Sequence, residues 1–397
     1  MKTLLIIGGT GVLSSAVTAE AQRQGISVTM INRGNRRIPD GVNHIKADRE
    51  DTSRIKALLA GKSFDAVMDF LCYTDAATEK SFKLYSQYTK QYFYVSSMAV
   101  YDKTVPGPLE ETHPKPLQVW PYSINKWKSE QKLQQMAAET DCKVTVIRPS
   151  VTYGNTRIPY GIYPQYGYHW TLCARIIAGK PIITWNQGKN TTTMLRVEDF
   201  AVGMVGLVGN PKAYNEAFNI CADVSTTFGE VLSILGRYLK KDVKTVDLPV
   251  EWYAAQMPKR AGELKGGRAM EVNCFPDEEW RTNQKIKNIV PSFKQTISVE
   301  DGIKMTLEAY EDQNYQNGID WKFDADTDRI IRKWCKKEGI DDSLYHLGFT
   351  DYLGNATESN KLIYWVEYHK DNIFVHAFRG CTWLAKGVFK RLSRFFS

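Results

Sequence analysis

The chain has 397 residues, 43% of them hydrophobic, and a formal net charge of +8 at pH 7. This length allows a large core in two connected lobes, and the modest charge permits anionic small molecules without indicating nucleic acid. The seven cysteines are odd in number and include no C-x-x-C pair, which argues against a disulfide framework or a structural zinc site. The cysteine pattern therefore predicts no metal and favours a reducing cytoplasm. No apolar run approaches the roughly 18 residues of a membrane span.

The N-terminus predicts a strand, a glycine turn and a helix in that order. The apolar run 4–7 precedes three glycines, and small and apolar residues continue to Gly25. This is the order of a dinucleotide-binding unit, in which the helix N-terminus offers N–H groups to a pyrophosphate. A secretory signal peptide is the alternative, but glycines interrupt the apolar run and a strand candidate follows at once. The expected cofactor contacts in the turn are Gly8, Thr10, Gly11, Val12 and Leu13.

Residues 1 to about 150 alternate strand and helix signals. Such alternation is typical of an α/β fold, here a Rossmann-type doubly wound parallel sheet. The predicted strands are Thr3–Ile7, Ser27–Ile31, Val42–Lys46, Ala66–Phe70, Gln91–Val95 and Lys143–Ile147. The predicted helices are Gly11–Gln24, Thr52–Leu59, Ala76–Tyr88 and Tyr122–Glu139.

The ends of the second, third and fourth strands supply further candidates for the cofactor site. An NAD site usually has an acidic residue after the second strand, whereas this chain has Asn32 followed by Arg33. A guanidinium can pair with a 2′-phosphate, so the pattern favours NADP over NAD, although Arg33 can equally be a solvated side chain. Asp48 is a candidate for the adenine amino group or, alternatively, a strand-end cap. We add Phe70 to the predicted cofactor contacts.

The segment Tyr122-Ser-Ile-Asn-Lys126 is a Y-x-x-x-K pattern at a predicted helix start. Its spacing places both side chains on one helix face. A lysine beside a tyrosine stabilises phenolate and lowers the phenol pKa from about 10, which produces a general acid/base for an alcohol or ketone. Ser97, at the end of the fifth strand, supplies a hydroxyl to orient the substrate oxygen. An exposed helix pair is the alternative, but the glycine turn and Ser96-Ser97 make chance a poor explanation.

At this point the chain resembles the extended short-chain dehydrogenase/reductase family, the nucleotide-sugar epimerase, dehydratase and reductase group. The resemblance covers about residues 3 to 250 and includes GGTGVLS, VSSMAVY, PYSINK, VIRPSVTYG and MLRVEDFA. It implies a smaller, interleaved C-terminal substrate lobe and a homodimer. It also implies a nucleotide-sugar substrate in surface glycan biosynthesis, changed by a 4-epimerase or keto-sugar reductase that uses NADP or NAD.

The resemblance also implies residue roles. Tyr122 corresponds to the catalytic acid/base, Lys126 to its partner and a ligand of the nicotinamide ribose, and Ser97 to the hydroxyl that polarises the substrate. The remaining implied contacts are Pro149 and Ser150 beside the nicotinamide, Arg196 near the nucleotide phosphates, and Tyr153 at the substrate.

Two departures from the family pattern matter. The fourth strand ends in Asp69-Phe-Leu-Cys-Tyr73, where many members have a His-Leu-Ala-Ala-like segment. This resembles a side branch with atypical members, including chloroplast RNA-binding relatives, so a cofactor-sensing or RNA-binding protein without turnover is the alternative function. The 4,6-dehydratases have Thr-Asp-Glu where this chain has Ser97-Met98-Ala99, which disfavours dehydration.

The expected organisation has three parts. A dinucleotide-binding domain spans 1–170 and is re-entered around 196–222. A substrate-binding lobe comprises 171–195 and 223–330, and a helical extension covers 331–397. The aromatic loop 153–170 can wall a substrate pocket or lie on the surface. Segment 371–397 has apolar and basic residues at helical spacing, which suits docking on the body and peripheral attachment to a membrane alike.

Overall fold

The computed structural model describes the chain except residues 116–119, 162–167, 266–281, 313–317, 342–355 and 376–397. It divides the chain into two compact units. Unit 1 contains residues 1–162, 185–235 and 249–313, and unit 2 contains 163–184, 236–248 and 314–397. The predicted basic amphipathic helix lies almost wholly outside the described residues.

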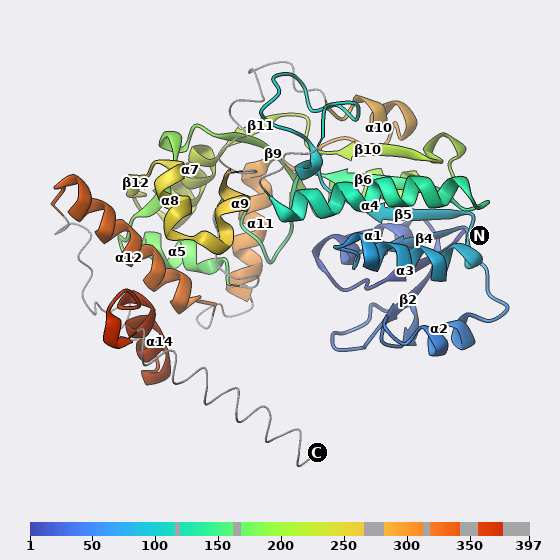
Figure 1. Cartoon of the computed structure of the whole chain (residues 1–397), viewed down its shortest axis with the longest axis horizontal. Helices are drawn as coiled ribbons and strands as arrows, with labels where there is room; N and C mark the ends of the chain where they lie inside the picture. Colours follow the sequence, from blue (N-terminus) through green and yellow to red (C-terminus); the bar gives the residue numbers. More distant parts are fainter. Residues whose placement is uncertain (116–119, 162–167, 266–281, 313–317, 342–355, 376–397) are drawn as a thin grey trace, which may run out of the picture. The chain divides into compact units, whose positions relative to one another are not determined.

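Unit 1 is built on a parallel sheet of seven strands in the order β10-β6-β5-β4-β1-β2-β3. This confirms the predicted Rossmann-type sheet (Figure 1). The strands are β1 (Thr3–Ile7), β2 (Ser27–Asn32), β3 (Asn43–Lys46), β4 (Ala66–Asp69), β5 (Gln91–Val95), β6 (Lys143–Pro149) and β10 (Glu216–Ile220).

Helices cover both faces of this sheet. Leu4 and Ile6 of β1 join a core with α1 (Val12–Arg23), α6 (Val197–Gly206) and α10 (Gln284–Ile289). Leu5 and Ile7 join a second core with α2 (Thr52–Leu59), α3 (Asp75–Tyr85) and α4 (Pro121–Ala138). Because β1, β4 and β5 are buried on both sides, their sequences are nearly continuous apolar runs rather than alternating ones.

The rest of unit 1 carries a second, smaller sheet, in which β9 (Thr191–Arg196) lies between β7 (Val151–Tyr153) and β11 (Ser225–Thr227). Aromatic rings form the neighbouring core, where Trp185 contacts Tyr160, Phe228 and Tyr253. The helices of this part are α7 (Phe228–Leu239), which continues into unit 2, α8 (Val250–Gln256), α9 (Ala261–Glu263) and α11 (Val299–Asp312).

Unit 2 combines a two-stranded sheet, β8 (Ile182–Thr184) with β12 (Thr245–Asp247), and, among its described residues, three further helices. These are α5 (Trp170–Ile177), α12 (Trp321–Glu338) and α14 (Glu358–Tyr368). Asp320 accepts a hydrogen bond from Phe323 N at 3.0 Å and so begins α12, while its own backbone N–H donates to Thr171 Oγ1 at 2.8 Å. The bond between Asp320 and Thr171 therefore joins the start of α12 to α5.

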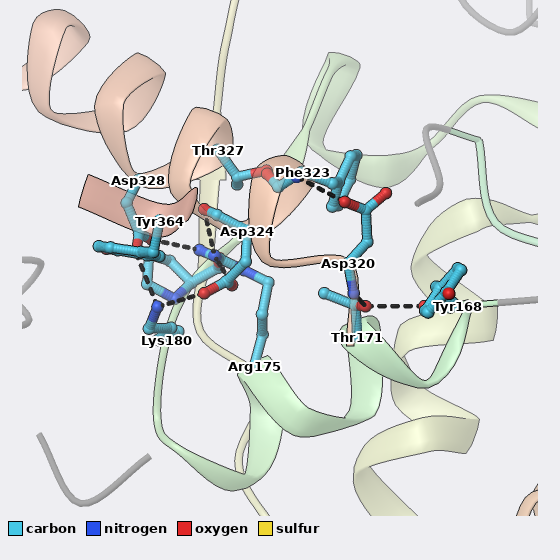
Figure 2. Close-up of polar contacts among 11 residues, drawn as sticks. Tyr168, Thr171, Arg175, Lys180, Asp320, Phe323, Asp324, Thr327, Asp328 and Tyr364 are labelled. Atoms are coloured by element: carbon cyan, nitrogen blue, oxygen red, sulfur yellow. Dashed lines mark hydrogen bonds and ion pairs between the residues drawn. The ribbon is translucent and has the colours of Figure 1, made fainter. Parts of the chain in front are cut away.

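A buried network of charges ties α5, α12 and α14 together (Figure 2). Arg175 bonds Asp324 at 2.6 Å and Asp328 at 2.9 Å, and Lys180 Nζ lies 2.7 Å from a carboxylate oxygen of each. Tyr364 of α14 donates its hydroxyl to Asp328 at 2.6 Å. Two cations and two anions thus neutralise each other away from water, which is the arrangement that buried charges require.

No helix in the described part of the chain is long and apolar enough to cross a membrane. The five cysteines that the structure describes are all buried.

Candidate active site

The glycine turn lies between β1 and α1. Gly8 and Gly9 have φ values of 103° and 83°, in the left-handed region that favours glycine. A Cβ on Gly9 would lie 2.4 Å from the end of the Met30 side chain, so a larger residue there would displace this methionine. Gly11 is the N-cap of α1 and has no side chain to satisfy the first-turn N–H groups. The turn therefore fits a pyrophosphate by its shape and because the N–H groups in the first turn of α1 can donate to phosphate oxygens.

Ser14 occupies the place of the third glycine. Its hydroxyl is buried and accepts a hydrogen bond from Gly11 N at 2.9 Å. The serine thus stabilises the turn from inside the first turn of α1, which explains why this departure from glycine is compatible with the fold.

Asn32 at the end of β2 belongs to the same turn. Its Nδ2 donates to Gly8 O at 2.8 Å, and its Oδ1 accepts from Gly34 N at 2.8 Å. Arg33 is exposed, and Arg36 returns to the turn and donates from Nη1 to Thr10 O at 2.7 Å. Sequence reasoning missed Arg36, although the left-handed Gly34 between the two arginines (φ 73°) is a signal that the chain turns back there.

Asp48 and Phe70 lie at the ends of β3 and β4. Asp48 is exposed and accepts a hydrogen bond from Glu50 N at 3.0 Å, so it does cap the strand end as the alternative reading expected. Phe70 is half-buried and donates its backbone N–H to Ile7 O at 3.3 Å. Their contacts with a cofactor stay predictions.

Lys126 is the best-defined group of the site. It is 3% exposed, and its Nζ donates to Cys72 O at 2.8 Å and to Val95 O at 2.7 Å. Val95 ends β5 and Cys72 lies in the segment that follows the adjacent strand β4, so the ammonium lies at the carboxyl edge of the sheet, where open α/β folds bind ligands. Burial lowers the pKa of Lys126 to about 8, against the opposing influence of Cys72, Asp69 and Glu130.

Tyr122 lies one turn before Lys126, with its ring centroid 5.8 Å from the lysine Nζ. It is half-buried and in the first turn of α4, which Pro121 begins. The neighbouring ring of Trp120 lies 5.0 Å away, centroid to centroid. The structure therefore brings Tyr122 and Lys126 together on one helix face, as the spacing predicts.

Ser97 follows β5 and begins the short helix η2 (Met98–Val100), where its Oγ accepts from Ala99 N at 3.1 Å. Ser123, next to Tyr122, donates its hydroxyl to Ala99 O. This bond joins the turn that carries Ser97 to the start of α4. The hydroxyls of Ser97 and Ser123 thus both bond the backbone of Ala99.

Glu130 was missed by sequence reasoning. It accepts hydrogen bonds from Ser96 Oγ at 2.5 Å and from Arg148 Nη2 at 2.6 Å, and all three side chains are buried. Glu130 thereby fixes α4 to the ends of β5 and β6. Its signal was its spacing, because Tyr122, Lys126 and Glu130 recur every four residues along one helix face.

Pro149 ends β6, and Ser150 Oγ donates to Thr193 O at 2.9 Å. Arg196 is completely buried, with its guanidinium 5.6 Å from the ring of Tyr153, which is buried too. The arginine donors bond Glu198, Asn155, Gly302 O and Thr306. In this arrangement Arg196 and Tyr153 fasten α11 to the second sheet. A contact of either side chain with a ligand would require some of these bonds to break, and the predicted contacts of both stay predictions.

A family model described as the NAD dependent epimerase/dehydratase family matches residues 4–221. The chain belongs to this family. The match covers the glycine turn, the seven-stranded sheet and the Tyr122–Lys126 pair, so family and geometry agree on the same part of the chain.

Two curated relatives and one solved structure are similar to this chain. A chloroplast stem-loop binding protein of 41 kDa (b) from Arabidopsis thaliana is 28% identical over 57% of this chain and 60% of its own length. A 2′-dehydrokanamycin reductase from Streptomyces kanamyceticus is 21% identical over 64% of this chain and 71% of its own. UDP-glucose 4-epimerase from Thermotoga maritima, solved with UDP-glucose, has a TM-score of 0.60 at 19% identity, over 78% of this chain and 99% of that one. The last comparison concerns the fold alone.

Proposed function

We propose that the chain is an NAD(P)-dependent oxidoreductase or epimerase that acts on a secondary alcohol or ketone of a nucleotide-activated sugar. The observation that carries the proposal is Lys126, which is buried beside Tyr122 and bonds the carbonyls of Cys72 and Val95. A buried ammonium next to a phenol stabilises phenolate, which is what a general base for a carbinol proton needs.

The chain's own residues divide the work as follows. Ser97 orients the substrate oxygen, and Tyr122 accepts the hydroxyl proton on oxidation or donates a proton to the ketone on reduction. Lys126 stabilises the phenolate, and its third N–H, after the two bonds to carbonyls, is free to hold the nicotinamide ribose. The cofactor, when bound, accepts or donates hydride at the substrate carbon.

The residues present fit a dinucleotide, with NADP favoured over NAD. A Cβ on Gly9 would collide with Met30, so the tight turn requires glycine there, and the N-cap of α1 leaves N–H groups for phosphate. At the place of the usual acidic residue, Asn32 is neutral and bonds Gly8 O of the glycine turn. Arg33 is exposed, and Arg36 bonds Thr10 O of the same turn. Two guanidinium groups favour a 2′-phosphate, and this supports a reductase that exchanges NADPH.

The same geometry disfavours 4,6-dehydration. That reaction needs an acid and a base beside the catalytic tyrosine, and Ser97-Met98-Ala99 carries no carboxylate. The nearby carboxylates, Asp69 and Glu130, are buried and already accept hydrogen bonds. Hydride chemistry at one carbon, in a 4-epimerase or a keto-sugar reductase, is therefore what the site supports.

The decisive experiment replaces Tyr122 by phenylalanine, with Tyr214→Phe as a matched control for loss of a phenol elsewhere in unit 1. We expect Tyr122→Phe to lose about 10² to 10⁴ in rate and the control to lose nothing. Activity of Tyr122→Phe within a few-fold of the unchanged chain would exclude the acid/base role. Mass spectrometry of the copurified nucleotide separates the two reactions, since retained NAD supports an epimerase and preference for added NADPH supports a reductase.

The name of the plant relative favours a second candidate, in which the fold binds an RNA stem-loop without turnover. The candidate predicts RNA affinity that falls steeply as salt rises, because phosphate contacts release counterions. It also predicts no oxidation of NAD(P)H with any keto-sugar. Salt-independent or absent RNA binding would remove it.

We also propose a peripheral contact with an anionic membrane, in a cytoplasmic homodimer. Segment 372–397 contains five arginines and lysines, six phenylalanines and tryptophans, and no acidic residue. In the described part, Ile373 and Phe374 are 77% and 81% exposed, which supports the proposal. Co-sedimentation with anionic liposomes should fall for a chain ending at Asp371, and equal partitioning would exclude the contact. Sedimentation velocity tests the dimer.

A further inference from the structure

The segment Asp69–Tyr73, which departs from the family pattern, is fastened from both sides. Asp69 Oδ1 accepts from Leu71 N at 2.7 Å, and its Oδ2 accepts from Cys72 Sγ at 3.0 Å. Asp69 is itself buried at the end of β4. One carboxylate therefore folds the next three residues back over the strand end.

Two cations hold the carbonyls of the same segment. Arg49, from the end of β3, donates to Leu71 O at 2.5 Å and to Cys72 Sγ at 3.6 Å. Lys126, from α4, donates to Cys72 O at 2.8 Å. Three side chains thus anchor two consecutive residues, Leu71 and Cys72, and so fix where the next residue, Tyr73, begins.

Tyr73 is placed against the ammonium of Lys126. Its ring centroid lies 4.9 Å from Nζ, that of Tyr94 lies at 5.0 Å and that of Tyr122 at 5.8 Å. All three distances are within the roughly 6 Å at which a ring face attracts a cation. Lys126 thus lies among three tyrosine rings, supplied by the end of β4, by β5 and by α4.

We propose that Tyr73 is a positioning residue that keeps Lys126 protonated in its buried site by a cation–π contact. Desolvation favours the neutral amine, and the ring faces favour the ammonium. The charged and titratable groups around Lys126 that act with it are Asp69 and Cys72 of the pinned segment, Glu130 and Tyr122 of α4, and Tyr94 of β5. The contribution of Tyr73 to catalysis rests on the proposed function, whereas its effect on Lys126 does not.

Tyr73 is also the ring of the three that can be changed with least disturbance. Its side chain is 56% exposed, whereas Tyr94 is completely buried and Tyr122 is the proposed acid/base. Tyr73→Phe keeps the ring face and removes the hydroxyl. Tyr73→Leu removes the ring face and keeps an apolar cover, and Tyr73→Ala removes both.

The test is a direct titration of Lys126 in protein made with ¹³C-labelled lysine and followed by NMR, with the Lys126 signal assigned by its loss in Lys126→Arg. We expect Tyr73→Leu to lower the pKa of Lys126 by about half a unit to one unit, and Tyr73→Phe to leave it unchanged. Tyr214→Leu, a half-buried tyrosine elsewhere in unit 1, is the matched control and should change nothing.

Two results would overturn the proposal. An unchanged pKa in Tyr73→Leu together with a raised pKa in Tyr73→Ala would mean that Tyr73 only excludes water. Equal downward shifts in Tyr73→Phe and Tyr73→Leu would mean that the hydroxyl, not the ring face, acts on Lys126. Because the titration needs no turnover, it stands even if Tyr122→Phe stays active, and so it separates failure of this inference from failure of the proposed function.

Discussion

At the scale of single residues, Lys126 shows how burial turns a common side chain into a titrating group near neutral pH. Its pKa is lowered to about 8 because the ammonium is desolvated, and two carbonyls fix its position. The protonated form, which stabilises phenolate, is therefore complete below this pH and lost above it.

The first prediction is an alkaline limb in activity. We expect kcat/KM to fall as pH rises through about 8, since Lys126 loses its proton there. Lys126→Arg keeps a charge that does not titrate, so it should be slower but should lack this limb. The measurement is a pH–rate profile with saturating cofactor, and a limb that persists unchanged in the arginine variant would contradict the assignment.

The second prediction concerns cofactor choice. Arg33→Glu places a carboxylate where a 2′-phosphate is expected, so the KM for NADP should rise by about 10- to 100-fold while that for NAD stays level. Arg37→Glu is the control, because Arg37 is exposed and lies 3.3 Å from Asp40 rather than at the glycine turn. Equal effects on both cofactors, or an equal effect of the control, would argue against 2′-phosphate recognition.

Motifs predict the candidate reacting residues but not the residues that hold them. Tyr122, Lys126 and Ser97 could be predicted because their chemistry depends on spacing within one element. Arg36 and Glu130 could not, since each acquires its role from a carbonyl or a charge on another segment of the chain. Conversely, Arg196 is a conspicuous arginine in the sequence, yet it is completely buried and bonds Glu198, Asn155, Gly302 O and Thr306.

At the scale of elements, strands with two buried faces were the most predictable. The predicted strand Gln91–Val95 matches β5, and Thr3–Ile7 matches β1, because a continuous apolar run has few other structures open to it. Helix starts were accurate within about a residue where Asp51 or Thr74 caps them. β10 was not predicted, since it is short and begins with an exposed Glu216, and its partner β6 defines it.

The third prediction concerns the buried charges that join α5, α12 and α14. Asp324→Ala leaves Arg175 and Lys180 short of one carboxylate in a site without water, so unfolding free energy should fall by about 3 to 5 kcal/mol. Asp371→Ala removes the half-exposed partner of Arg329 and should cost no more than about 1 kcal/mol. Urea unfolding compares the two, and similar losses would mean that the buried network is not what holds α12.

At the scale of the whole molecule, the sequence predicted two lobes but not how the chain divides between them. The compact units exchange the chain at several points, and α7 begins in unit 1 and ends in unit 2. Such exchanges depend on contacts between distant segments, which no local pattern encodes. The assignment of substrate binding to 171–195 and 223–330 stays a prediction.

The fourth prediction is stabilisation of the whole chain by its cofactor. A ligand that binds only the folded state adds about 2.7 kcal/mol to the unfolding free energy at a hundred times its Kd. Because we propose that NADP binds more tightly than NAD, NADP should raise the melting temperature more at equal concentration. Gly9→Val, which would collide with Met30 and so distort the turn, should abolish the difference. A larger shift with NAD would reverse the proposed preference.

The two acceptors of Lys126 have a consequence for how this chain tolerates change. Both are main-chain carbonyls, of Cys72 and Val95, and a side-chain substitution leaves a carbonyl in place. Variation at position 95 can therefore accumulate without moving the ammonium, whereas at position 72 the bonds of the Leu71 backbone to Asp69 and Arg49 must keep the path of the segment once the thiol bonds are lost. The most chemically demanding group of the site is in this way insulated from mutation at one of the two residues that hold it.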